Sequence, residues 1–442
     1  KEFHKKQNFF SFSDIDSERK DRIMKFTSTE ATPAPHVPPG VLRLTGAAKE
    51  DIPMYHIQTM NKISPVGLNR FPSELYEVGD AVQDPQGILV RSAKLLDLEF
   101  NPSLLAIARA GVGVNNIPLD RCAAAGIPVF STPGANANAV KELVICAMLM
   151  GSRDIPGAIR WVREQAASGV DVSTVVEKGK SAFIGPELYK KTLGIIGLGA
   201  IGSIVANTAI SLGMDVYGYD PFLSVDTALR LDRHVHVVKD INDLYKRSDY
   251  ITMHIHYTEK TAHMIDADAI AAMKRGVRVI NLARGEIVDD EAMLTALDTG
   301  MVAAYITDFP NNRLLTAPHV IAMPHLGAST PESEQNCAAM AVDTLRDYLE
   351  SGNIRSSVNL PEMTMDRSGV QRLCVLHKNV PGMLANITSL FGRDGVNVEN
   401  LSNKSRGDYA YTMVDLGSKV GDNVIEDVRR TANVIRVRSL EW

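Results

Sequence analysis

Short apolar runs alternate with helical spacing along most of this chain. Before residue 130, the apolar runs at 87–90, 104–108 and 127–130 have the length of strands, which predicts a small α/β unit. Residues 138–155 then carry apolar positions at helical spacing over a long stretch. We expect a helix there that crosses between two domains.

The pattern is most regular between residues 191 and 325. Helical stretches of about 10–15 residues separate most of the strand-like runs. These runs lie at 193–196, 216–219, 250–254, 277–281, 303–306 and 320–323. Such alternation predicts an α/β fold with a parallel, doubly wound sheet of the Rossmann type. Residues 330–351 have the pattern of one long amphipathic helix.

The two ends of the chain differ from this middle. Residues 371–442 have a β-α-β-β-α-β pattern, which predicts a small α+β domain, and the polar linker 361–369 separates it from the rest. Residues 1–53 include a proline-rich stretch with little to bury. We interpret 1–53 as an extension of unknown role outside the fold.

Composition narrows the class of protein. A chain of 442 residues predicts about three domains. Apolar content of 45% with 22% charged residues is typical of soluble globular proteins, and a net charge of -5 gives no general attraction to nucleic acid. The four cysteines lack metal-site spacing, so we expect reduced thiols with neither a disulfide framework nor a metal site. Without a membrane-length apolar run or a signal peptide, we expect a cytoplasmic protein.

A glycine fingerprint gives the sharpest local signal. Gly197, Gly199 and Gly202 follow a predicted strand and open a predicted helix, and the next strand ends at Asp220. The glycines allow a tight turn, approach of the backbone to a pyrophosphate and helix–strand packing, while the acid binds ribose hydroxyls. Because no arginine follows Asp220, NAD is favoured over NADP. A glycine turn in a Rossmann-like fold that binds something else is the alternative.

Two charged residues follow later strands of the same predicted sheet. Arg284 comes shortly after 277–281, and His325 comes after 320–323, so both lie at the edge where open α/β sheets bind ligands. Oxidation of an alcohol needs a base for the hydroxyl proton and a cation for the developing alkoxide, which a histidine and an arginine supply. Taken alone, His325 would more often be a structural histidine and Arg284 part of a surface ion pair, but both at strand ends beside a dinucleotide fingerprint favour a catalytic role.

Residues 54–442 resemble the D-isomer-specific 2-hydroxyacid dehydrogenases. The resemblance rests on 109–116, 136–143, 281–285, 325–330 and the glycine fingerprint. It implies a discontinuous, flavodoxin-like substrate domain (54–150 plus 330–360), an NAD-binding domain (151–329) and a hinge in the helix 138–155.

The resemblance also assigns roles to individual residues. Arg284 binds the substrate carboxylate and carbonyl oxygen, His325 accepts the proton, and backbone at Val112 and Gly113 cradles the substrate. Asp308 holds the nicotinamide carboxamide. The other cofactor-binding positions are Ala200, Ile201, Leu282, Ala283 and Gly327.

Within this family, the resemblance is to members that oxidise D-3-phosphoglycerate to 3-phosphohydroxypyruvate, the first step of L-serine biosynthesis. A phosphate needs cations, and Arg91 and Lys141 are the candidates, although Arg91 fits a surface arginine equally well. Two alternatives stay open. One is another 2-hydroxyacid dehydrogenase, such as a hydroxypyruvate or glyoxylate reductase, and the other is a non-catalytic NAD-sensing protein.

One departure from the family pattern concerns the catalytic acid. The family usually carries a glutamate between the arginine and the histidine, where residues 307–313 of this chain have none. The carboxylate that orients the histidine is therefore missing. Either Asp308 or an asparagine replaces it, or His325 works unassisted.

Residues 371–442 resemble an ACT domain, a small regulatory fold that binds amino acids. The resemblance rests on residues 377–382 and 395–397. It implies that His377, Asn379 and Asn397 bind the effector L-serine, although these asparagines could equally cap turns. We expect such domains to pair in a homodimer or homotetramer.

Overall fold

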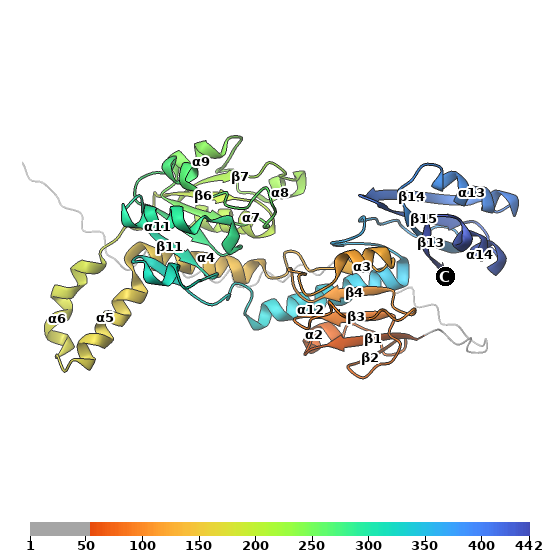
Figure 1. Cartoon of the computed structure of the whole chain (residues 1–442), viewed down its shortest axis with the longest axis horizontal. Helices are drawn as coiled ribbons and strands as arrows, with labels where there is room; N and C mark the ends of the chain where they lie inside the picture. Colours follow the sequence, from red (N-terminus) through yellow and green to blue (C-terminus); the bar gives the residue numbers. More distant parts are fainter. Residues whose placement is uncertain (1–53) are drawn as a thin grey trace, which may run out of the picture. The chain divides into compact units, whose positions relative to one another are not determined.

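The computed structural model describes residues 54–442, so the predicted extension 1–53 lies outside the described residues. Three sheets organise this part of the chain (Figure 1). The first is five-stranded and parallel, with the order β2-β1-β3-β4-β5. Its elements are β1 (Tyr55–Met60), α2 (Pro65–Leu68), β2 (Tyr76–Gly79), β3 (Gly87–Val90), β4 (Ala106–Arg109), α3 (Leu119–Ala124) and β5 (Val129–Phe130). The strands predicted at 87–90, 104–108 and 127–130 are confirmed to within a few residues.

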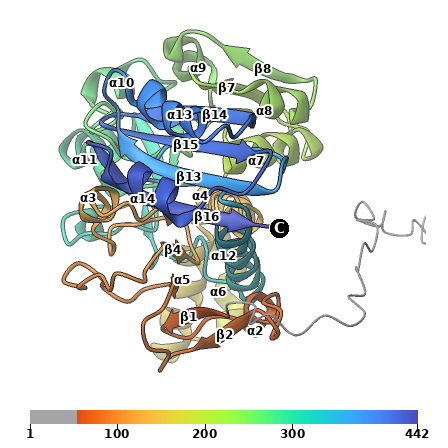
Figure 2. The same ribbon diagram turned by 90° about the vertical axis from the view of Figure 1, so that its right-hand side faces the viewer.

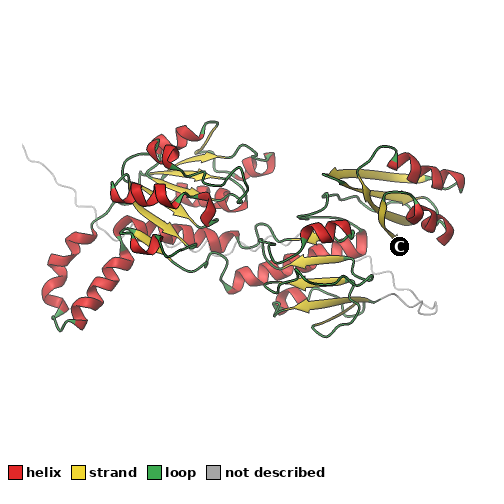
Figure 3. Ribbon diagram, in the orientation of Figure 1, coloured by secondary structure: helices red, strands yellow, loops and turns green. Residues whose placement is uncertain are grey.

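The second sheet is seven-stranded and parallel, with the order β12-β11-β10-β9-β6-β7-β8, as the doubly wound pattern predicts. Its strands are β6 (Thr192–Ile196), β7 (Asp215–Tyr219), β8 (Val235–Val238), β9 (Tyr250–Met253), β10 (Val277–Asn281), β11 (Val302–Thr307) and β12 (Val320–Ala322). Its connecting helices, red in Figure 3, are α7 (Ala200–Ser211), α8 (Val225–Arg230), α9 (Ile241–Arg247), α10 (Ala267–Ala271), η2 (Gly285–Ile287), α11 (Asp290–Asp298) and η3 (Leu314–Thr316).

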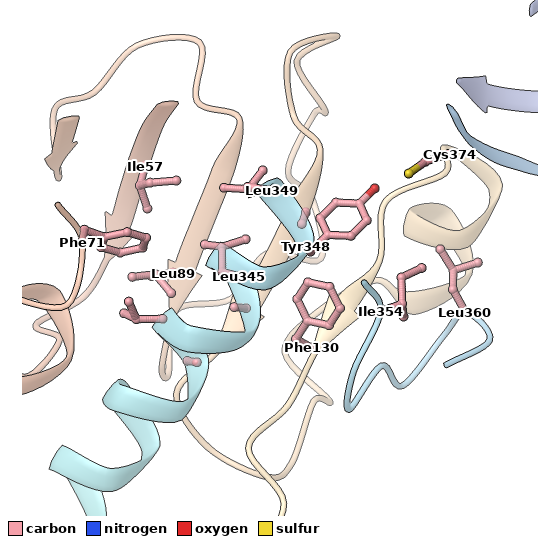
Figure 4. Close-up of a cluster of buried hydrophobic side chains, with 14 of the residues drawn as sticks. Ile57, Phe71, Leu89, Phe130, Leu345, Tyr348, Leu349, Ile354, Leu360 and Cys374 are labelled. Atoms are coloured by element: carbon pink, nitrogen blue, oxygen red, sulfur yellow. The ribbon is translucent and has the colours of Figure 1, made fainter. Parts of the chain in front are cut away.

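Two long helices join these sheets. Helix α4 (Ala137–Arg153) precedes the second sheet, and its buried residues Val144 and Met148 share a core with β6. Helix α12 (Pro331–Ser351) follows that sheet and packs back on the first one, where Leu345 lies among Ile57 and Leu89 (Figure 4). The chain after residue 330 therefore completes the core of the first sheet.

A helical hairpin that the sequence pattern left unassigned lies between α4 and β6. Helices α5 (Ile155–Ala167) and α6 (Val172–Gly179), with the short η1 (Lys180–Phe183), form the yellow hairpin of Figure 1. The ring centroids of Trp161 and Phe183 lie 6.1 Å apart. A side chain at Gly179 would collide with Trp161, so this glycine allows the close approach.

The third sheet is antiparallel with the order β14-β15-β13-β16, as the C-terminal pattern predicts (Figure 2). Its elements are β13 (Gln371–Lys378), α13 (Met383–Arg393), β14 (Val398–Arg406), β15 (Tyr409–Leu416), α14 (Asp422–Arg430) and β16 (Val434–Glu441). Both helices pack on one face. The other face adds Cys374, Tyr411 and Leu440 to the core around α12.

The prediction of a polar linker at 361–369 is wrong in part. Met363 and Met365 are buried in the core around α12 and alternate with exposed Glu362 and Asp366. Because side chains of an extended segment alternate between two faces, two buried methionines can lie within a stretch whose composition is polar. Composition alone therefore does not reveal the buried face. In the part of the chain that the structure describes, no helix is both long and apolar enough to cross a membrane.

Candidate active site

Three side chains lie at the carboxyl ends of three adjacent strands. Arg284 follows β10, Asp308 follows β11 and His325 follows β12, and these strands are neighbours in the parallel sheet. Parallel strands present their carboxyl ends at one edge, where α/β sheets bind ligands. The structure thus brings the two predicted catalytic residues together and adds Asp308 between them.

A buried amide fixes the backbone that carries Arg284. The fully buried Asn281 donates from Nδ2 to the carbonyl oxygen of Arg284 (2.8 Å) and accepts at Oδ1 from the N–H of Ala283 (3.1 Å). The same Nδ2 lies 3.3 Å from the hydroxyl of Tyr305 on β11. Asn281 therefore ties the turn after β10 to the neighbouring strand.

Asp308 is buried without a polar partner. Its side chain is 1% exposed, and neither carboxylate oxygen has a hydrogen-bond partner among the described residues. Burial raises the pKa of this carboxyl above its ordinary value, while the charge of His325, the nearby backbone N–H groups of Gly327 and of Asp308 itself, and the charge of Arg284 oppose that rise. A buried acceptor without a donor fits an amide of a ligand, such as the nicotinamide carboxamide.

An aromatic ring lies between the two predicted catalytic side chains. The Phe309 ring centroid is 4.6 Å from that of His325, and the guanidinium carbon of Arg284 lies 5.7 Å from it. His325 is exposed, whereas Arg284 is partly buried and donates from Nη1 to the carbonyl of Ala283 (2.6 Å). Phe309 therefore supports both groups on one apolar surface.

Further arginines gather at the carboxyl edge of the first sheet. Arg109 ends β4 and Arg91 follows β3, the strand beside it, and Arg109 donates from Nε to the carbonyl of Arg91 (3.0 Å). Burial lowers the pKa of Arg109, and the nearby charges of Arg284 and Arg91 lower it further. A Cβ at Gly113 would lie 3.3 Å from Nη2 of Arg284. The predicted substrate-binding backbone at Val112 and Gly113 therefore adjoins a cluster of cations suited to an acid with several negative charges.

The glycine turn has the geometry that a pyrophosphate requires. Gly197 has a φ of +90°, which favours glycine, and a Cβ at Gly202 would collide with the carbonyl oxygen of Gly197. A Cβ at Gly199 would meet nothing within 4 Å, and no side chain caps helix α7 there. The N–H groups at Ala200 and Ile201 in the first turn are thus open to an anion.

The remaining predicted cofactor residues lie along the same edge. Asp220 follows β7 and accepts from the N–H groups of Leu198 and Phe222, both at 2.9 Å. A carboxylate retains further acceptor capacity for ribose hydroxyls. Leu282 and Ala283 are buried at the end of β10, and Gly327 lies beside Asp308. These residues fit a bound NAD.

The other predicted ligand residues fit less well. Lys141 donates to Asn138 on its own helix α4 (2.7 Å) and lies 3.8 Å from Glu142 of the same helix. In the C-terminal domain, His377 is 2% exposed and both ring nitrogens are engaged, by the carbonyl of Lys378 and by Thr412. Asn379 bonds to the carbonyl of Gly407, and Asn397 bonds to Glu399, and both are exposed.

Arg109, Phe309 and Asn281 have no role predicted from the sequence. Arg109 ends a strand-like run, and the carboxyl-edge argument that identified Arg284 applies equally to it. The roles of Phe309 and Asn281 depend on side-chain packing, for which the sequence carries no signal.

The chain is similar in sequence to known dehydrogenases. The family model for the D-isomer specific 2-hydroxyacid dehydrogenase, NAD binding domain, matches residues 145–327. A D-3-phosphoglycerate dehydrogenase of Haemophilus influenzae is 31% identical over 379 residues, covering 82% of this chain and 88% of the relative. One from Synechocystis is 36% identical over 326 residues, covering 72% of this chain but 56% of the relative. This chain thus spans little more than half the length of some curated relatives.

Solved structures have the same fold. An NAD⁺-bound 3-phosphoglycerate dehydrogenase of Entamoeba histolytica is 26% identical to this chain, with a TM-score of 0.54. The match covers 69% of this chain and 99% of that one.

Proposed function

The chain belongs to the D-isomer-specific 2-hydroxyacid dehydrogenases, and from this premise we propose that it oxidises D-3-phosphoglycerate to 3-phosphohydroxypyruvate with NAD, the first step of L-serine biosynthesis. The observation that carries the proposal is the grouping of Arg284, Asp308 and His325 at the ends of adjacent strands beside an arginine cluster. The relatives named D-3-phosphoglycerate dehydrogenase support the same substrate.

Each residue has a defined task in the proposed reaction. Arg284 binds the carboxylate and the hydroxyl oxygen through its planar fork of donors, and Asn281 holds Arg284 in place. His325 accepts the hydroxyl proton as the general base. NAD, when bound, supplies the acceptor for the hydride of the C2 carbon. Arg91 and Arg109 provide positive charge for the phosphate.

Asp308 is our candidate for the carboxylate that the family places elsewhere. Asn311 is engaged by Asp290 and by the N–H groups of Arg313 and Leu314, so it is not free to support His325. Asp308 is buried, and the charge of His325 is the strongest of the influences that lower its pKa. Its negative charge stabilises the imidazolium that forms when His325 takes the proton, in addition to binding the nicotinamide amide.

A spectrophotometric assay of NADH formation tests the proposal. The purified chain with D-3-phosphoglycerate and NAD should turn over faster than with D-glycerate or D-lactate. A preference for glyoxylate or hydroxypyruvate with NADH would instead support one of the reductases. No turnover with any of these acids would support a non-catalytic NAD-binding protein.

We further propose that the C-terminal domain binds L-serine and that the protein is a cytoplasmic homodimer or homotetramer. Because both nitrogens of His377 are already engaged, Asn379 and Asn397 are the better candidates for the ligand. Calorimetry should detect serine binding to the parent and none to an Asn379→Ala, Asn397→Ala double variant. If millimolar serine neither binds to the parent nor slows its turnover, the domain binds another ligand or is structural.

A further inference from the structure

We propose that Glu334 is a specificity-determining residue, which holds Arg91 before substrate binds and which a phosphate must displace. The starting observation is an ion pair between Nη2 of Arg91 and Oε1 of Glu334, at 2.5 Å. Arg91 follows β3, whereas Glu334 lies in the first turn of α12. This inference rests on the proposed function, because it assigns Arg91 to the substrate phosphate.

Of the three arginines in the cluster (Arg91, Arg109 and Arg284), Arg91 is the one with an ion pair among the described residues, to Glu334. The cluster is tight, because the charges of Arg91 and Arg284 both lower the pKa of Arg109. The carboxylate of Glu334 offsets one of these charges while the phosphate position is empty. A phosphate ester carries about −1.5 to −2 charges near pH 7, which exceeds the charge of a carboxylate. The substrate therefore neutralises the cluster better than Glu334 does.

The geometry allows this exchange at low cost. The side chains of Arg91 and Glu334 are 43% and 44% exposed, and exposed ion pairs contribute little because water competes with them. The backbone of Glu334 is held, since Thr330 caps α12 by accepting from the N–H of Ser333 and both Ser333 and Cys337 are buried. The carboxylate can thus swing into solvent without moving the helix.

The consequence is discrimination between ligands. A phosphate that reaches Arg91 bidentately compensates for the lost ion pair, whereas an unphosphorylated acid bound at Arg284 leaves the pair intact. Small inorganic anions must displace Glu334 without the other contacts that the full substrate makes. Glu334 therefore weakens the binding of free phosphate more than it weakens the binding of the complete substrate.

Steady-state kinetics with saturating NAD tests the inference on Glu334→Gln, which keeps the size of the side chain and removes the charge. Its KM for D-3-phosphoglycerate should fall about 3- to 20-fold, given the modest strength of an exposed pair plus the repulsion removed. Its KM for D-glycerate and its turnover number should change less than about twofold. Glu332→Gln, an exposed carboxylate in the same helical turn, should leave both KM values unchanged.

Three results would overturn the inference. These are an unchanged or higher KM for phosphoglycerate in Glu334→Gln, equal shifts for both substrates, or the same shift in Glu332→Gln. If the parent does not oxidise phosphoglycerate, the proposed function fails, and calorimetry with inorganic phosphate then decides the role of Glu334. Tighter binding of phosphate by Glu334→Gln than by the parent, abolished in Arg91→Ala, supports it. Equal affinities in parent and Glu334→Gln refute it.

Discussion

The side-chain amide of Asn281 donates to the carbonyl oxygen of Arg284 at 2.8 Å, and Asn281 is fully buried. This bond sets the direction in which the chain leaves β10 and thus the position of the Arg284 guanidinium. Small displacements of a substrate-binding group weaken catalysis far more than they weaken folding.

We therefore expect Asn281→Ala to lower kcat/KM by about 10- to 100-fold while the affinity for NAD changes little. The thermal unfolding temperature should also fall, because a buried hydrogen-bonding group is lost. Initial-rate kinetics and NAD titration on the same samples check this. Asn242→Ala, an exposed position near the start of α9, should leave kcat/KM at the parental value.

His325→Asn should reduce the turnover number by about 10²- to 10⁴-fold, the usual contribution of a general base, with NAD affinity preserved. The substitution keeps a polar side chain against the ring of Phe309 but cannot accept a proton at neutral pH. Turnover within about fivefold of the parent would remove His325 from the mechanism.

Without cofactor, the ionised Asp308 side chain should lower the free energy of unfolding. Burial raises its pKa above the ordinary value of 3.8, so the folded chain binds the proton more tightly than the unfolded chain does. The stability linked to this proton is present below pH 3.8 and is lost as the pH rises through the raised pKa of the folded state. Asp308→Asn should therefore be more stable than the parent at pH 7, with a difference that shrinks towards pH 4.

Urea unfolding of the apo protein across this pH range measures the effect, and Asp97→Asn, at an exposed carboxylate, is the matched control. The same Asp308→Asn variant should bind NAD more weakly and turn over more slowly. A variant less stable than the parent at pH 7 would show that Asp308 has partners in the folded protein.

The strands and helices were largely predictable because their signals are local. Apolar runs of strand length predict β10 and β12, and the glycine fingerprint needs only the residues from the strand to the next acid. Arg284 and His325 could be located without knowledge of any contact, because ligands bind at the carboxyl edge of such sheets.

The remaining features depend on residues far apart in the chain. Glu334 and Arg91 are 243 positions apart, and nothing near either residue indicates the other. His377 lies on the same face of β13 as Leu373 and Val375, the face that α13 and α14 cover, so its resemblance to an effector ligand could not reveal that it is buried with both nitrogens used. Arg372, which is paired with Asp415 in the core, likewise has the sequence pattern of an ordinary strand residue.

Asp220 should control the choice of cofactor. Asp220→Ala removes the acceptor for the ribose hydroxyls and for the N–H of Leu198, so the KM for NAD should rise about 10- to 100-fold. Combining it with Phe222→Arg should shift the preference towards NADP, because Phe222 is 91% exposed and its replacement costs little packing. Unchanged preference, measured as the ratio of kcat/KM values, would place the ribose-binding acid elsewhere.

Buried contacts of Arg372 attach the C-terminal domain to the end of α12 and to the segment that follows it. Arg372 and Asp415 form a completely buried ion pair (Nε–Oδ1 2.6 Å), and Arg372 also donates to the carbonyls of Ser351, Met365 and Asp366. Arg372→Met leaves the Asp415 carboxylate buried without its cation, which should cost about 3–5 kcal/mol in the free energy of unfolding.

Arg429→Met, which breaks an exposed pair on α14, should cost less than about 1 kcal/mol and lose that effect in high salt. The buried pair should keep its contribution in salt because solvent ions do not reach it. Since Arg372 bonds to the last turn of the helix that carries Glu334 in its first turn, the loss of Arg372 should also alter the KM for phosphoglycerate. A destabilised variant with parental KM would show that α12 holds Glu334 in place without help from the C-terminal domain.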